Sequence, residues 1–209
     1  MKLSGMTVTA FVDELASASP APGGGSIAAL GAALAAGLTS MVGELTVGRE
    51  KYKDAQEDME DLRSEGKVGA SKLLDLMEKD TDAFNSFMDA MKLPKDTDEL
   101  KKTRSEAMQK AAKGTVEVPM RTLTLCAEIE KMALLAAQKG NANAVTDAGT
   151  AGQFARAAAI SAAYNVRVNL FSIKDAEYVA DARAKVAALL DDIETTAREL
   201  SDHLEKALS

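Results

Sequence analysis

A loop of proline, glycine and serine precedes an uncharged, alanine-rich stretch near the start of the chain. It reads SPAPGGGS over residues 19–26. Three consecutive glycines leave backbone N–H groups unshielded, and before a helix such groups favour an anion through their donors and the helix dipole. A loop that needs unusual φ angles or close backbone packing explains the same residues equally well. A dinucleotide site is excluded because no strand precedes the glycines, and no Gly-Lys-Ser/Thr follows as in a phosphate-binding P-loop.

A carboxylate interrupts an apolar helical stripe further along. Asp80 follows Leu73, Leu76 and Met77 at helical spacing, so its side chain is predicted to face the core. A buried carboxylate costs free energy unless it is paired or functional, which makes Asp80 a candidate for chemistry. The neighbouring Asp82 is predicted to face another side and solvent.

Two further groups of polar residues have competing interpretations. Arg49 and Lys51 follow the uncharged stretch, where cations favour a helix C-terminus in any case; the alternatives are a grip on a polyanionic tail or a lysine near the chemistry. Asn165 and Asn169 lie four residues apart on one helix face. Their amides suit a flat heterocycle, or they satisfy neighbouring helix ends. Arg156 is a candidate partner for a buried aspartate.

The rare residues exclude several kinds of site. The chain has 209 residues, one Cys and one His. Cys126 cannot form an internal disulfide and is expected in the core, while His203 is expected in solvent. A Cys/His zinc site lacks its ligands, and a Ser-His-Asp triad, which would have to use His203 near the C-terminus, is not expected. Proton transfer therefore falls to carboxylates, Lys, Tyr or the substrate. We expect no metal.

The charge balance argues against two classes of partner. The net charge is −7 with no basic block, so nucleic acid and anionic membranes are unsuitable partners. Residues 17–43 carry no charge, but their prolines, glycines and alanines predict a tightly packed helix rather than a membrane span. We expect a cytoplasmic protein.

Helix-forming residues dominate the whole chain and alternating strand patterns are missing. The sequence predicts an all-α, single-domain bundle of five or six helices over residues 1–209. Gly66 and Gly69 are expected to bend or weaken the third helix, and Pro119 is expected to kink the fourth. The expected helices cover residues 9–16, 26–48, 54–91, 97–139, 147–171 and 174–207.

Five segments together resemble the cyclodeaminase/cyclohydrolase family of folate one-carbon enzymes. The resemblance covers nearly the whole chain in order. Its segments are SPAPGGGSIAALGAALAAGLTSMVGELTVGREKYK (19–53), DTDAFNSFMDAMKLPKDT (80–97), VPMRTL (118–123), GNANAVTD (140–147) and AYNVRVNL (163–170). The fourth segment has Ala142 and Thr146 where members often have Pro and Ser, and both changes are mild.

The resemblance implies an all-helical homodimer with its folate cleft between or beside the subunits, and no cofactor besides the folate substrate. It implies a methenyltetrahydrofolate cyclohydrolase, which adds water to the 5,10-methenyl bridge to give 10-formyltetrahydrofolate. The alternative is a formiminotetrahydrofolate cyclodeaminase, which forms the same bridge with loss of ammonia. A weaker alternative is a non-catalytic helical dimer that serves as a scaffold. The chain stands alone, without a formiminotransferase half to supply formimino-folate, and this favours the cyclohydrolase.

The resemblance also suggests a role for each candidate residue. Asp80 and Asp147 are predicted as acid/base or cation-stabilising groups, and Lys51 as a proton-transferring group or a grip on the glutamate tail. The remaining candidates are predicted to bind substrate. They are Pro22, Gly23, Gly24, Gly25, Ser26, Arg49, Asn141, Asn165 and Asn169.

Overall fold

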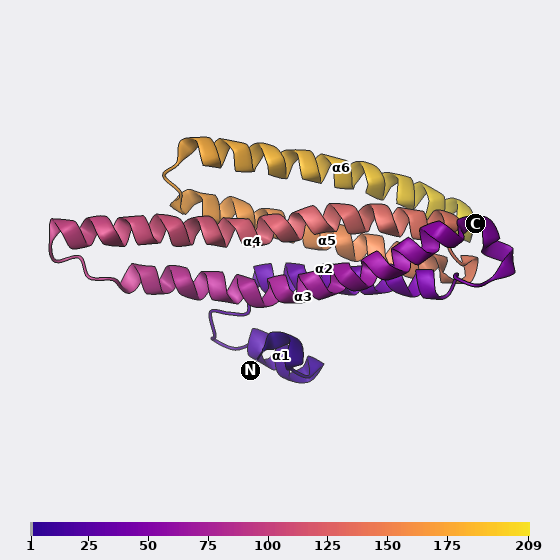
Figure 1. Cartoon of the computed structure of the whole chain (residues 1–209), viewed down its shortest axis with the longest axis horizontal. Helices are drawn as coiled ribbons and strands as arrows, with labels where there is room; N and C mark the ends of the chain where they lie inside the picture. Colours follow the sequence, from indigo (N-terminus) through magenta and orange to yellow (C-terminus); the bar gives the residue numbers. More distant parts are fainter. Residues whose placement is uncertain (1) are drawn as a thin grey trace.

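The computed structural model describes residues 2–209 and contains, over that range, helices and no strand. Six α-helices form the molecule, as the composition predicts, and four short 3-10 turns join or flank them (Figure 1). The α-helices are α1 (Val8–Leu15), α2 (Gly24–Glu44), α3 (Gln56–Lys92), α4 (Asp98–Lys139), α5 (Val145–Asn169) and α6 (Ala176–Leu208). The 3-10 turns are η1 (Leu3–Gly5), η2 (Glu50–Ala55), η3 (Ala142–Ala144) and η4 (Leu170–Ser172).

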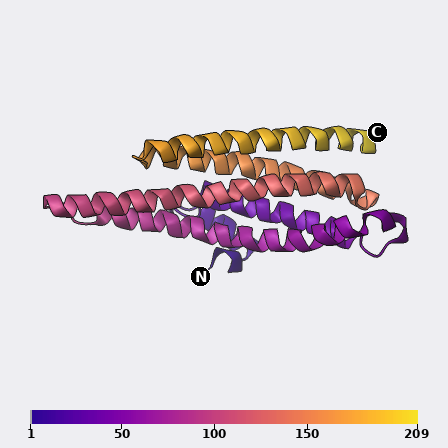
Figure 2. The same ribbon diagram turned by 45° about the horizontal axis from the view of Figure 1, so that its top comes forward.

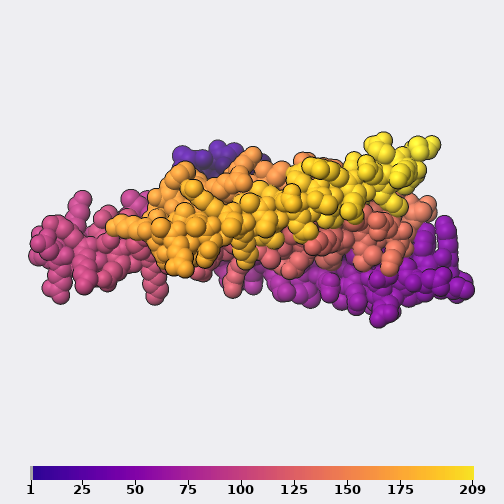
Figure 3. Space-filling model, turned by 90° about the horizontal axis from the view of Figure 1, so that it is seen from above, coloured from indigo at the N-terminus to yellow at the C-terminus, as the bar shows by residue number. Residues whose placement is uncertain are grey.

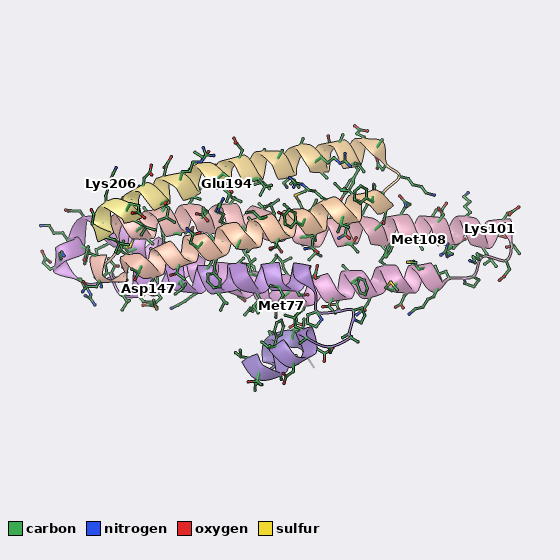
Figure 4. All side chains as sticks on the ribbon, turned by 180° about the vertical axis from the view of Figure 1, so that it is seen from behind. Met77, Lys101, Met108, Asp147, Glu194 and Lys206 are labelled. Carbon is green, nitrogen blue, oxygen red and sulfur yellow. The ribbon has the colours of Figure 1, made fainter. Side chains whose placement is uncertain are left out.

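The five long helices lie roughly side by side, and α1 packs beneath them as a separate short element (Figures 1 and 2). Figures 1 and 4 show α3 and α4 on one side of the bundle and α2 and α5 on the other. The ends of α3 and α4 project past the other helices, which is also plain from above in Figure 3. This arrangement leaves one side of α2 and one side of α5 without a neighbouring helix.

The uncharged helix α2 packs through very small side chains. Ala32, Ala35 and Ala36 are fully buried. A β-carbon at Gly66 of α3 would lie 2.8 Å from the backbone oxygen of Ala36, so only glycine permits this approach of α2 and α3. Helix α3 is continuous through Gly66 and Gly69, and Gly66 serves this contact.

Helix α2 also has the length and apolar character of a membrane span, the only such helix among residues 2–209. In its most apolar window, 61% of the residues are buried inside the bundle. The apolar composition is therefore largely used in packing against the neighbouring helices.

Helix α4 runs unbroken through Pro119, where a kink is predicted, and the backbone hydrogen bond lost at the proline has a replacement. Proline lacks the N–H that would bond the carbonyl four residues earlier. That carbonyl belongs to Thr115, and it accepts a hydrogen bond of 2.6 Å from Nδ2 of Asn169. An α5 side chain thus replaces the missing backbone donor.

Other side chains also settle into structural roles. Cys126 is buried as predicted. Arg156 pairs with Glu194 at 2.8 and 2.9 Å rather than with an aspartate of the site. His203 was expected in solvent but is half-buried, with Nε2 3.0 Å from the carbonyl oxygen of Ala137.

Glu130 is the one charged side chain that is buried within residues 2–209. Neither carboxylate oxygen has a hydrogen-bond partner there. Burial raises the pKa of Glu130 to about 8; Glu194 adds to the rise, while Arg156 opposes it. The carboxyl group is therefore mostly protonated at neutral pH in the folded protein.

This burial predicts a loss of stability at alkaline pH. The folded pKa of Glu130 lies above the unfolded value of 4.5, so its contribution is present at low pH and disappears as pH rises through about 8. Urea unfolding should show the free energy of unfolding falling by roughly 2–3 kcal/mol more between pH 6 and pH 9 in the wild type than in Glu130→Gln.

Glu128→Gln is the matched control, because Glu128 is exposed on the same helix. Its pH dependence should follow the wild type. An unchanged pH dependence in Glu130→Gln would show that the buried carboxyl group titrates normally.

Candidate active site

A pocket of about 200 Å³ opens where the proline-glycine loop enters α2. Helices α3, α4 and α5 complete its wall. The lining residues are Pro20, Ala21, Gly23, Gly24, Gly25, Asp80, Thr81, Phe84, Thr115, Asn165 and Asn169. The pocket thus gathers the predicted glycine loop, Asp80 and both asparagines.

Asp80 lies against the first turn of α2. The hydroxyl of Ser26 donates a hydrogen bond of 3.0 Å to Oδ2 of Asp80, and the Ser26 backbone N–H donates another. Burial nevertheless raises the pKa of Asp80 above its ordinary value, because its effect exceeds that of the two hydrogen bonds. A carboxyl group whose pKa moves toward neutrality suits proton transfer.

The glycine loop makes room for this carboxylate. A β-carbon at Gly25 would overlap the carboxylate atoms of Asp80, so the sequence needs glycine there. Pro22 is buried beside the loop, joined to Ala21 by a cis peptide bond. The glycines could have served to bind an anion or to allow close packing. The structure shows close packing, and the group packed against Gly25 is the Asp80 side chain.

The two asparagines present oxygens to the pocket. Nδ2 of Asn165 donates to the Ser161 carbonyl oxygen at 2.9 Å, and Nδ2 of Asn169 donates to Thr115. Each amide group therefore uses one of its two N–H donors within the protein. The second N–H and the oxygen of each amide remain for a ligand, which agrees with the prediction that this face suits a flat heterocycle.

Five lining residues were not predicted as site residues: Pro20 and Ala21 of the loop, and three from the helices. Thr81, Phe84 and Thr115 line the pocket. The Thr81 hydroxyl is buried and has no hydrogen-bond partner within residues 2–209, so a ligand would satisfy it. Phe84 follows Asp80 by four residues, a helical spacing that could have indicated a shared face.

The other predicted residues lie at the far end of α2 and α5. Arg49 and Lys51 follow the end of α2, while Asn141 and Asp147 flank the start of α5. The 18 residues from Asp147 to Asn165 correspond to about 27 Å along α5. Figure 4 shows Asp147 toward one end and Met77, one turn before Asp80, near the middle. Within one chain the predicted residues thus form two groups.

Tyr52 organises this second group. Its hydroxyl accepts a hydrogen bond of 3.0 Å from the Ala142 N–H and donates one of 3.4 Å to Oδ1 of Asn141. The Ala142 bond, with help from nearby Lys51, lowers the pKa of the Tyr52 phenol. Asn141 is buried and also donates to Thr46 and Leu45, so it fastens η3 to the end of α2. Arg49 and Lys51 are exposed beside it.

Within residues 2–209, no cluster of three or more His, Cys, Asp or Glu side chains has the arrangement of a metal site. The chemistry of the pocket is that of a carboxyl group, amide oxygens, hydroxyls and helix N–H groups. Such groups can move protons and stabilise a cation.

Comparison with known protein families shows which family this chain belongs to. A family model described as formiminotransferase-cyclodeaminase matches residues 7–188, which include both groups of polar residues. The chain belongs to the formiminotransferase-cyclodeaminase family. The resemblance inferred from the sequence segments is therefore confirmed.

Relatives of two kinds occur in this family. The chain is 37% identical to a methenyltetrahydrofolate cyclohydrolase from Methylorubrum extorquens, with 88% of each chain covered. It is 35% identical to the formimidoyltransferase-cyclodeaminase of Sus scrofa over 93% of this chain, but it spans only 36% of that protein. A crystal structure of a Thermotoga maritima formiminotetrahydrofolate cyclodeaminase superposes with a TM-score of 0.90 at 25% identity, covering 99% of this chain and 100% of that one.

The position of Gly25 predicts the outcome of one small substitution. Gly25→Ala should displace the Asp80 carboxylate, because the added carbon would occupy its place. Turnover should fall by ~10²-fold or more if Asp80 takes part in proton transfer. The measurement is the steady-state rate at which the variant converts its folate substrate, with circular dichroism to show that the variant is folded.

Gly114→Ala is the control, since its β-carbon meets nothing within 4 Å. That variant should retain wild-type turnover. Full turnover in folded Gly25→Ala would show that the contact between α2 and Asp80 is not needed.

Proposed function

We propose that this family member is a methenyltetrahydrofolate cyclohydrolase, interconverting 5,10-methenyl- and 10-formyltetrahydrofolate. The observation that carries the proposal is the half-buried Asp80, held by Ser26 at the start of α2 and facing a pocket lined by Asn165 and Asn169. The cyclohydrolase of Methylorubrum extorquens supports this choice over the deaminase, since it matches the present chain along most of both lengths.

The reaction needs little more than a positioned carboxylate. The bridge carbon of the methenyl compound belongs to an amidinium-like cation, so it is already electrophilic. Before the reaction, the negative charge of Asp80 stabilises the cation. As a water molecule adds to the bridge carbon, Asp80 takes a proton from that water. When the bond from the bridge carbon to N5 breaks, the protonated Asp80 returns a proton to N5. The second proton of the water is released to solvent.

The asparagines and Thr81 serve recognition in this proposal. The free amide oxygens of Asn165 and Asn169 accept hydrogen bonds from N–H groups of the pterin, and the unpartnered Thr81 hydroxyl supplies one more. The pocket, at about 200 Å³, is smaller than the usual 300–1,000 Å³ of sites that enclose a drug-sized ligand. We therefore place the reacting end of the folate in the pocket and its tail outside.

A second copy of the chain completes the site in our proposal. Exposed apolar side chains run along the uncovered sides of α2 and α5, including Leu34 at 52%, Tyr164 at 62% and Val168 at 57% exposure. Exposed apolar side chains gathered on one side of two helices are typical of an interface between subunits. The Asp80 pocket lies at one end of this face and Arg49 and Asp147 lie at the other.

Two-fold symmetry follows naturally from that layout. In a C2 dimer the same face pairs with itself, and we place the two-fold axis through the middle of the face and across the helices, so that each end of one copy meets the opposite end of the other. Arg49 and Lys51 of the second copy would then meet the anionic folate tail. Asp147 of the second copy would approach the reacting end as a second carboxylate.

The second candidate function is formiminotetrahydrofolate cyclodeaminase. The match of the Thermotoga maritima structure along the whole chain favours it. Protonated Asp80 would donate its proton to the nitrogen that leaves as ammonia, just as it donates a proton to N5 in the cyclohydrolase reaction. The same pocket thus serves either reaction.

Turnover of 5,10-methenyltetrahydrofolate, followed by its near-ultraviolet absorbance, tests the proposal. The wild type should convert it to 10-formyltetrahydrofolate well above the uncatalysed rate. Asp80→Asn should lower turnover by ~10²-fold or more, since an amide cannot accept the proton. Because burial raises the pKa of Asp80, activity should fall on acidification at a higher pH than an ordinary aspartate gives, and Ser26→Ala should move that fall higher still.

Asp82→Asn is the matched control, because Asp82 is exposed two residues away and should be dispensable. Lack of acceleration by the wild type, with rapid turnover of 5-formiminotetrahydrofolate, would replace the first candidate by the second. Inactivity toward both substrates would contradict both and favour a scaffold.

A further inference from the structure

A second hollow, of about 370 Å³, lies on the opposite side of the bundle from the apolar face of α2 and α5. Its floor is α4, and its walls are α3 and α6, which Figure 1 shows on either side of α4. The lining residues are Lys72, Asp75, Leu76, Lys79, Arg121, Thr124, Leu125 and Lys185. None of them lines the Asp80 pocket.

Four cations surround this hollow although the chain as a whole is acidic. Lys72 and Lys79 come from α3, Arg121 from α4 and Lys185 from α6. Within residues 2–209, none of the four forms an ion pair, whereas many other basic side chains do. Like charges from three helices repel one another unless an anion lies between them. All four side chains are exposed, so water screens their repulsion in the empty hollow, and an anion bound there would be attracted to all four.

The remaining lining residues refine the chemistry of the site. Leu76 and Leu125 supply apolar surface that displaces water, which strengthens the attraction between charges. Asp75 is the single carboxylate of the lining. Glu117 and Asp181 border an adjoining hollow that shares Arg121 and Lys185. Glu65 and Glu128 border another that shares Lys72. Lys79 is the lining cation that neither adjoining hollow shares.

We propose that the hollow between α3, α4 and α6 binds a compact polyanion, a small molecule with several phosphate or carboxylate groups, at a site separate from the folate pocket. Three helices contribute the cations, so an occupant would join α3 to α6 across α4. The site faces away from the proposed dimer interface and remains open when two copies associate.

Titration calorimetry of the full chain with tripolyphosphate and with citrate tests the proposal and distinguishes the two sources of charge. At least one of them should bind saturably, with half-saturation below about 1 mM at 0.15 M salt. The double variant Lys72→Ser/Arg121→Ser should weaken that binding at least tenfold. Asp75→Asn should tighten it several-fold by removing a like charge, an effect that a purely structural role would not produce.

The matched control is Lys102→Ser/Arg198→Ser, which removes the same charge from exposed positions outside the hollow. It should bind as the wild type does, and all variants should keep basal turnover. Absence of saturable binding of either anion would overturn the proposal. An equal loss of binding in the control would also overturn it, because net charge alone would then account for the attraction.

Discussion

The contact between Asp80 and the first turn of α2 is the constraint on which the rest of the site depends. A carboxylate is costly to bury, and here the Ser26 hydroxyl and backbone N–H offset part of that cost. The contact exists only because Gly25 has no side chain. The glycine loop, the start of α2 and the middle of α3 are therefore one unit, and a change in any of them moves the catalytic candidate.

The helical frame sets where ligands can lie. Small residues bring α2 close to α3, and Gly43 and Gly66 mark two places where the two backbones leave no room for a side chain. The outer sides of α2 and α5 carry exposed apolar side chains, and polar groups lie at both ends of these helices. Asn169 connects frame and pocket, because it completes the hydrogen bonding of α4 at Pro119 and leaves its oxygen to the pocket. One side chain thus supports α4 and lines the pocket.

Much of this could be predicted from the sequence, because helix signals are local. Thr97 caps α4 and Lys139 ends it, as the sequence indicates. The Asp80 stripe correctly indicated a carboxylate facing inward. Pairings between helices are not local, so the partner of Arg156 and the use of Gly66 were missed. The distance between Asp147 and Asn165 follows from helix rise alone. That the end of α2 lies beside the start of α5, so that Arg49 and Lys51 join Asn141 and Asp147 in a second group, required the structure.

The central claim is that one site combines the Asp80 end of one chain with the Asp147 end of another, and mixed dimers test it most directly. Asp80→Asn and Asp147→Asn chains are assayed separately, then unfolded, mixed in equal amounts and refolded together. Random pairing puts both substitutions into one site of half the dimers and leaves the other site intact. The account predicts near inactivity for each variant alone and about a quarter of wild-type activity for the mixture. A mixture no more active than the average of its two components would contradict it.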